Sequence, residues 1–252
     1  MSLAKTNKLQ LAVIVCIVFA ACGDDGGGVV VDAGIDAPVA DAGPCGDELF
    51  YQVEVFDWST DISVPNSEIP GPTVTATVVG NETNTTPVAP NGRAVLCLSR
   101  GTTHTILFES TVHLPHLEIV DPDAYEDYLA SEQAIAYRVY VLKQADVDAL
   151  TDGVGAAQNG HVLVNVQGDD AGFTVAIDAS SDPGLVGSPT GTFASGTTTS
   201  ATDTWVVFRN ALVGTGETVL TLTGGIGCAA PTTIALAAGH TTGALAHCVV
   251  GP

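Results

Sequence analysis

The chain has 252 residues, of which 46% are hydrophobic and 14% are charged. Without residues 1–21, which hold two of its seven lysines and arginines, five cations face 28 acids, a formal charge of −23. A surface this negative repels phosphates and anionic lipid headgroups, so nucleic acid is excluded as a partner. The length favours two modest domains over one.

Residues 1–21 have the pattern of a signal peptide. A start that contains Lys5 and Lys8 precedes an apolar run from Leu9 to Ala21. That run is shorter than the roughly 20 apolar residues that a transmembrane helix needs. The pattern therefore predicts export and removal of residues 1–21.

The sequence Val-Phe-Ala-Ala-Cys at positions 18–22 resembles the lipobox of bacterial lipoproteins, although Phe19 stands where the family usually has leucine. The resemblance implies that Cys22 is acylated, with palmitate among the expected chains, and anchors the protein to the cell membrane. More than one acyl chain makes such anchoring stable. Gly23 after the cysteine, in place of aspartate, favours the outer membrane. There are two alternatives: a simple signal peptide with an incidental cysteine, and acylation at Cys16.

Residues 22–44 are a low-complexity run of glycine, alanine and aspartate. Such a run lacks the apolar side chains that would offset the entropy of ordering it. We interpret it as an acidic tether.

Residues 45–120 predict a first β-sandwich module, because short runs rich in Val, Thr and Ile alternate with Gly, Pro and Asn turns. Asn91 and Gly92 mark a tight turn, since both tolerate positive φ. Strands are expected at Leu49–Phe56, Thr73–Val79, Ala94–Leu98, Thr103–Phe108 and His116–Val120.

Residues 121–159 predict a short helical linker. Asp121 is a suitable N-cap and Pro122 suits the first helical position. A second short helix is expected at Gln144–Leu150.

Residues 160–252 predict a second β-sandwich module. In Phe173–Asp178 the large apolar side chains fall on one face, the pattern of a half-buried strand. Strands are expected at His161–Val166, Phe173–Asp178, Trp205–Phe208, Glu217–Leu222 and Thr232–Ala237.

The first β set resembles the carboxypeptidase regulatory-like, or transthyretin-like, β-sandwich family. Its Asn91-Gly92-Arg93 strand start and the glycine turn at Gly101 carry the resemblance, together with Gly71–Val79, Thr85–Thr86 and Thr105–Phe108. The second set resembles the same plan more loosely and has no Asn-Gly-Arg. The resemblance implies an all-β fold of two modules joined by a short helical linker, with a binding or spacer role that is usually non-enzymatic in this family.

Four cysteines remain once Cys16 and Cys22 are set aside: Cys45, Cys97, Cys228 and Cys248. An even number in an exported protein predicts disulfides, with three possible connectivities. We favour one per module, Cys45 with Cys97 and Cys228 with Cys248. Zinc is the weaker alternative because no pair has C-x-x-C spacing.

The histidines are the candidate metal ligands, with His113, His116, His240 and His247 as the set to test. Neutral imidazoles close in space bind zinc or iron. A metal site that includes both His113 and His116 is disfavoured, because residues three apart in a strand point to opposite faces.

The segment Val112–Ile119 also resembles the histidine strand of the intradiol ring-cleaving dioxygenases, with Tyr125 and Tyr128 nearby. That resemblance implies a non-haem iron site, but the two histidines are three residues apart here and two apart in the family.

The sequence thus predicts a membrane-anchored extracytoplasmic lipoprotein that acts as a binding or structural module of the cell envelope, with an envelope protein or a glycan as ligand and no cofactor. The alternative is a metal-dependent enzyme that uses the histidines. The sequence contains no G-x-S-x-G elbow, and a Ser-His-Asp set cannot be picked out among so many serines and aspartates.

Overall fold

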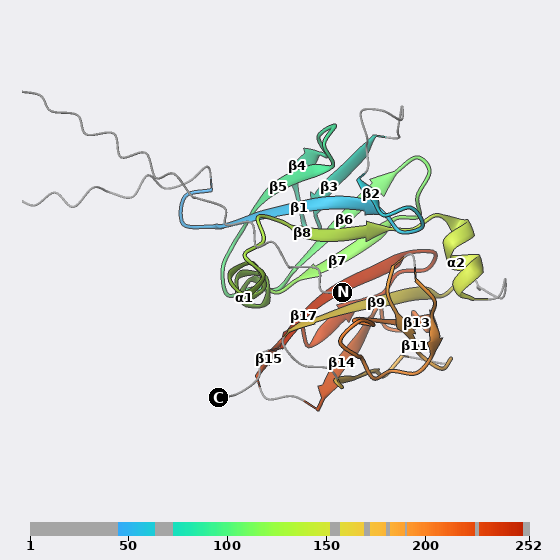
Figure 1. The fold of residues 1–252 in the computed structure, drawn as a ribbon. Coiled ribbons are helices and arrows are strands. Elements are labelled where there is room, and N and C mark those ends of the chain that lie inside the picture. The colour runs from blue at the N-terminus through green and yellow to red at the C-terminus, as the bar shows by residue number, and fades with distance from the viewer. Residues whose placement is uncertain are drawn as a thin grey trace, which may run out of the picture. The chain divides into compact units, whose positions relative to one another are not determined.

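Strands dominate the regular structure of this all-β protein (Figure 1). The computed structural model describes residues 45–63, 73–151, 157–168, 172–179, 182–189, 191–224 and 227–248. The expected signal peptide, Cys22 and the tether lie outside these residues. Asp41–Pro252 form one compact unit. No helix of the described part is long and apolar enough to cross a membrane.

A four-stranded sheet forms the first layer. Its central strand, β1 (Leu49–Asp57), pairs antiparallel with β5 (Arg93–Leu98) and β2 (Ile62–Ser63), and parallel with β8 (Tyr137–Val141). Every second residue of β1 is buried, because successive side chains of a strand point to opposite faces.

A ten-stranded sheet runs through both predicted modules (Figure 1). Its strands lie in the order β12 (Ala194–Ser195), β11 (Leu185–Gly187), β13 (Trp205–Ala211), β9 (Gly160–Gly168), β17 (Thr241–Cys248), β7 (His116–Val120), β6 (His104–Ser110), β3 (Val74–Val78) and β4 (Asn81–Pro87). The tenth strand, β15 (Cys228–Ala229), also pairs with β17.

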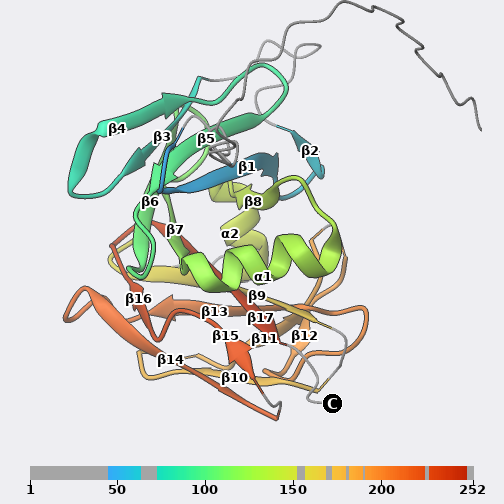
Figure 2. The same cartoon turned by 90° about the vertical axis from the view of Figure 1, so that its left-hand side faces the viewer.

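A third sheet, in the order β10 (Thr174–Ile177), β14 (Glu217–Thr223) and β16 (Thr233–Ala235), covers the second half of the long sheet (Figure 2). Side chains from both layers form one core, in which Val175, Leu220 and Ile234 contact buried residues of β9, β13 and β17. The four-stranded sheet packs in the same way over β3, β6 and β7 and forms a separate core.

The shared strand β17 holds the two halves together. It runs parallel to β7 on one side and to β9 on the other, and all eight of its residues are buried. Leu245 belongs to the first core, whereas Ala244 and Ala246 belong to the second. A strand that is buried on both faces in this way shows no polar and apolar alternation.

Two helices follow β7. Helix α1 (Pro122–Glu132) begins as the sequence predicts, since the Asp121 side chain accepts hydrogen bonds from the backbone N–H groups of Asp123 and Ala124. Helix α2 (Gln144–Leu150) has the predicted bounds. Asp146 caps it by accepting a hydrogen bond from the Lys143 backbone N–H at 2.7 Å.

The segment 121–159 differs from the predicted helical linker because it contains β8, which joins the first layer beside β1. Four of the five β8 residues are buried, so the alternation that identifies a strand is missing. The two predicted β sets are separate in sequence but not in space, because β17 joins them in one sheet.

Both favoured disulfides are present. Cys45 is bonded to Cys97, and Cys228 to Cys248. The first ties the start of β1 to β5, and the second joins β15 to the last residue of β17, which lies directly opposite in the ladder.

Candidate functional site

The four candidate metal-binding histidines have separate partners. His240 lies at the start of β17, with its Nδ1 2.9 Å from the Ala238 carbonyl, and the Nε2 of buried His247 is 2.8 Å from the Ser131 hydroxyl. His113 and His116 each contact a different carboxylate. Within the described residues, no three His, Cys, Asp or Glu side chains are arranged to hold a metal ion.

The two tyrosines of the expected iron site contact other groups. The Tyr125 hydroxyl donates to the Gln52 carbonyl and accepts from the Gln52 N–H, both at 2.8 Å. The Tyr128 ring packs edge-on against Tyr137. The observed contacts therefore give no support to the iron site that the dioxygenase resemblance implies.

A relay of three side chains, of which His113 and Asp57 are buried, links the end of β1 to the end of β6. The Asp57 Oδ2 atom is 3.0 Å from His113 Nε2, and His113 Nδ1 is 3.0 Å from the Ser110 hydroxyl. The side chains of His113 and Asp57 are only 2% and 6% exposed. Hydroxyl, imidazole and carboxylate thus stand in the order found in Ser-His-Asp hydrolases.

Asp57 is held in the charged form. Burial raises the pKa of this carboxyl group, but hydrogen bonds from Lys143, His113, Ser59 and Thr60 outweigh it and hold the pKa well below its ordinary value. The Lys143 ammonium lies 2.5 Å from Oδ2, while the hydroxyls of Ser59 and Thr60 donate to Oδ1 at 2.8 and 3.0 Å.

A second relay of the same kind is fully enclosed between β7 and β17. His116 Nδ1 is 2.8 Å from the Thr241 hydroxyl, and His116 Nε2 is 3.0 Å from Glu118 Oε2. Burial raises the pKa of Glu118, although the hydrogen bond with His116 opposes the shift. Glu118 Oε1 has no hydrogen-bond partner among the described residues. All three residues are buried, which closes this relay to any ligand.

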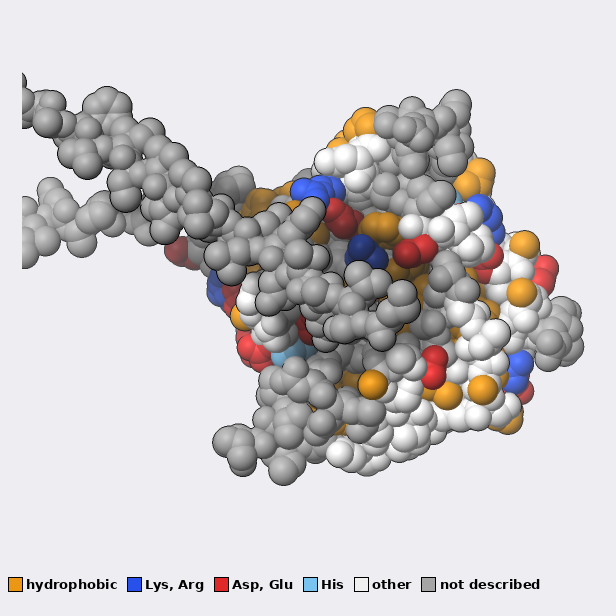
Figure 3. All heavy atoms as spheres, viewed as in Figure 1, with side chains coloured by type: hydrophobic (Ala, Val, Ile, Leu, Met, Phe, Trp, Pro, Cys, Tyr) orange, Lys and Arg blue, Asp and Glu red, His pale blue; other side chains and the backbone are white. Residues whose placement is uncertain are grey.

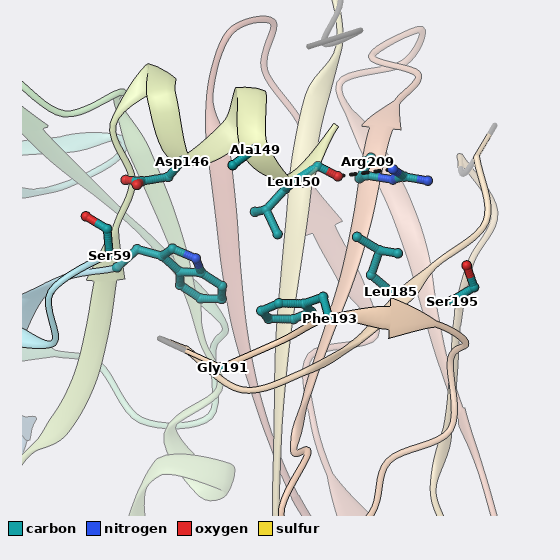
Figure 4. Close-up of a pocket in the computed structure, with 10 residues that line it drawn as sticks. Ser59, Asp146, Ala149, Leu150, Leu185, Gly191, Phe193, Ser195 and Arg209 are labelled. Atoms are coloured by element: carbon teal, nitrogen blue, oxygen red, sulfur yellow. Dashed lines mark hydrogen bonds between the residues drawn. The ribbon is translucent and has the colours of Figure 1, made fainter. Parts of the chain in front are cut away.

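The main cavity beside the first relay is a pocket of about 550 Å³ between α2 and the segment that holds β11 and β12 (Figure 4). This volume falls within the range usual for small-molecule sites. Figure 4 shows Leu150, Leu185 and Phe193 directed into the hollow, with Ser59 and Asp146 together at one end. The pocket is therefore lined by both apolar and polar side chains.

The inner wall of the pocket belongs to a cluster of four aromatic rings. The Trp58 ring stacks on Phe193 at 5.7 Å and meets Trp205 and Tyr140 edge-on at 5.5 and 5.8 Å. Trp58 follows Asp57 directly, so the hydrogen bonds that fix Asp57 also fix this wall. Arg209 stands at another side of the pocket, where it donates to the Leu150 carbonyl at 3.0 Å (Figure 4).

On the face in Figure 3, basic, acidic and apolar side chains of the described residues are interspersed. Two of the basic side chains are paired with acids, Arg93 with Glu54 and Arg100 with Glu126.

Sequence reasoning selected His113, as a candidate metal ligand, but missed Asp57, Ser110 and the residues of the pocket. Asp57 and His113 are 56 residues apart, and no local pattern connects them. The rarity of tryptophan is a weak indication in the sequence that Trp58 is important, since the chain has only two tryptophans. The structure places both in one cluster.

Comparison with known proteins gives little help. No protein-family model matches the chain, and no curated protein matches its sequence. Among solved structures, a mutant of the pilus-presented adhesin Spy0125 (Cpa) is 8% identical with a TM-score of 0.23, covering 67% of this chain and 36% of the adhesin. A double mutant of the shaft pilin SpaA from Lactobacillus rhamnosus GG is 11% identical with a TM-score of 0.21, covering 79% of this chain and 98% of the pilin. This chain therefore spans about a third of the adhesin, and both scores are too low to bear on function.

Proposed function

We propose that this protein is an exported lipoprotein of the bacterial cell envelope, anchored through Cys22 in the outer membrane, whose β region binds an envelope glycan. The N-terminal sequence supports export and anchoring. The two disulfides, Cys45–Cys97 and Cys228–Cys248, support an oxidising compartment outside the cytoplasm.

The aromatic-walled pocket is the single observation that carries the binding role. A sugar ring presents C–H groups on its faces and hydroxyls at its edge. Phe193, which stacks on the buried Trp58, offers apolar surface for such a face, while Ser59, Asp146 and Ser195 offer hydrogen-bonding groups beside it. The net charge of −23 beyond residue 21 favours a neutral glycan over an anionic one.

Tryptophan fluorescence tests this site directly, because Trp58 and Trp205 are the only tryptophans and both belong to the cluster at the pocket. Titration of the full chain in detergent with N-acetylglucosamine oligosaccharides is expected to give a saturable change. Phe193→Ala is expected to weaken binding at least about tenfold, since it removes one aromatic wall.

Phe50→Ala is the matched control, because Phe50 is 39% exposed on β1 and does not line the pocket. Its titration should match that of the wild type. A flat titration of the wild type, or equal affinity in the wild type and the Phe193 variant, would contradict glycan binding in this pocket.

The anchor has its own test. Radiolabelled palmitate is expected to be incorporated into the full chain in bacteria and to be lost in Cys22→Ser, because only a thiol forms the thioether to the lipid. Cys16→Ser is the control and should keep the label. Incorporation that persists in Cys22→Ser would contradict anchoring at this residue.

A further inference from the structure

We propose that Ser110 is a nucleophilic serine, activated by His113 and Asp57, that attacks small carboxylic esters at the protein surface. The proposal is independent of glycan binding, since Ser110 does not line the aromatic pocket. It rests on the relay geometry, on the directions of its hydrogen bonds and on the position of Ser110.

The hydrogen bonds of the relay have one consistent direction. Asp57 is a carboxylate and can only accept, so the proton between it and His113 is on Nε2. In a neutral imidazole the other nitrogen, Nδ1, then carries a lone pair, which accepts from the Ser110 hydroxyl at 3.0 Å. The Ser-His-Asp triad uses the two nitrogens the other way round, with Nε2 toward the serine and Nδ1–H toward the aspartate, but a neutral imidazole acts as a base through whichever nitrogen carries the lone pair.

The turn after β6 directs the hydroxyl hydrogen of Ser110 to His113. Its oxygen accepts from the backbone N–H groups of Val112 and His113 at 3.3 and 3.4 Å. Both bonds are long and leave the oxygen able to react.

Ser110 is open to small molecules while its base is not. Ser110 is half-buried, and Val112 beside it is 52% exposed, whereas His113 is enclosed. A nucleophile less buried than its imidazole and carboxylate suits a base that must keep its partners fixed.

The reaction balances without a cofactor. The Ser110 oxygen bonds to the ester carbonyl carbon as its proton passes to His113 Nδ1. The C–O bond of the ester then breaks, and the leaving alcohol takes that proton. Water repeats the two steps on the acyl-serine, releases the carboxylic acid and restores the Ser110 hydroxyl.

The chain contains an internal comparison. Ser131 is an exposed serine whose hydroxyl is 2.8 Å from the Nε2 of His247. The other nitrogen of His247, Nδ1, is buried without a hydrogen-bond partner among the described residues, so no carboxylate orients this ring. Ser110 and Ser131 therefore differ in whether a carboxylate orients the imidazole beside the hydroxyl.

The experiment treats the purified full chain with a fluorophosphonate and maps the adduct by mass spectrometry. Cleavage after glutamate places the two serines in separate peptides, Ser110–Glu118 and Asp127–Glu132. We expect the adduct on Ser110 to form at least about tenfold faster than on Ser131, because loss of the carboxylate that orients the imidazole lowers the rate of a Ser-His-Asp hydrolase by that factor or more. Hydrolysis of p-nitrophenyl acetate is expected to fall to background in Ser110→Ala.

This mapping needs no variant, so it stands even if a variant fails to fold. His113→Gln should abolish the Ser110 adduct, and Ser131→Ala should leave it unchanged. An unmodified Ser110 peptide, or equal modification of both serines, would overturn the proposal. So would ester hydrolysis that persists in Ser110→Ala.

Discussion

At the scale of single residues, Asp57 does more than its place at the end of a strand indicates. It accepts hydrogen bonds from the hydroxyls of Ser59 and Thr60, pairs with Lys143 and orients His113. One buried carboxylate therefore fixes the turn that leads into Trp58 and also the relay that ends at Ser110.

The lowered pKa of Asp57 predicts a pH-dependent contribution to stability. Because the pKa is lower in the folded than in the unfolded chain, ionised Asp57 stabilises the fold above its ordinary pKa of 3.8, and this contribution is lost as the pH falls below that value. Asp57→Asn is expected to reduce the free energy of unfolding at pH 7 by about 2 kcal/mol, the scale of hydrogen bonds to a charged group.

Chemical denaturation at a series of pH values measures this difference. The gap between the wild type and Asp57→Asn should narrow from pH 5 to pH 3. Asp148→Asn, on the exposed face of α2, is the control and should show a small gap that does not change with pH in this way. A constant gap for Asp57→Asn would contradict the role of its charge.

At the scale of elements, β17 is the strand on which both cores depend. At Gly243, close packing explains why this strand has a small residue. An added Cβ would lie 2.1 Å from Glu118 Oε2 and 2.9 Å from His116 Nε2. Both side chains belong to the enclosed relay and are held by hydrogen bonds, so they cannot move aside without breaking them.

Gly243→Ala is therefore expected to destabilise the protein by about 2 kcal/mol, within the range for overpacked cores. Gly214→Ala is the matched control, since nothing lies within 4 Å of its added Cβ. Thermal unfolding followed by circular dichroism should show a lower midpoint only for Gly243→Ala. Equal midpoints for the two variants would show that the Glu118 and His116 side chains can move aside for the added methyl group.

The aromatic pocket also depends on several elements rather than one. Trp58 comes from the end of β1, Trp205 from β13 and Leu150 from α2. Helix α2 and strand β8 lie between the two β sets along the chain, and both contribute to the cluster behind the pocket.

At the scale of the whole molecule, the shared sheet predicts a single unfolding transition. Strand β17, at the end of the chain, supplies the hydrogen-bonding partner of β7, and its Leu245 fills part of the first core. Loss of either half therefore exposes the edge and core of the other. Calorimetry of the full chain is expected to show one peak whose calorimetric and van't Hoff enthalpies agree.

A fragment of residues 45–159 tests the same dependence, because it lacks β17. We expect this fragment to show no cooperative unfolding when followed by near-UV circular dichroism. Addition of residues 160–252 in trans should restore it. A fragment that unfolds cooperatively alone would support the two independent modules that the sequence pattern predicts.

The sequence by itself determined the all-β class, ten of the strands to within a few residues, the cap and start of α1 and the bounds of α2. These features depend on local alternation, turn residues and capping, which are properties of neighbouring residues.

Only the tertiary structure decided the rest. Strands β8 and β17 escaped prediction because residues buried on both faces leave no alternation to read. The relay of Asp57, His113 and Ser110 and the pocket at Trp58 join side chains that are distant in sequence, and their geometry arises only when the sheets pack. The histidines proposed as one metal set were divided among different partners for the same reason, since the register of β7 and β17 sets what each imidazole contacts.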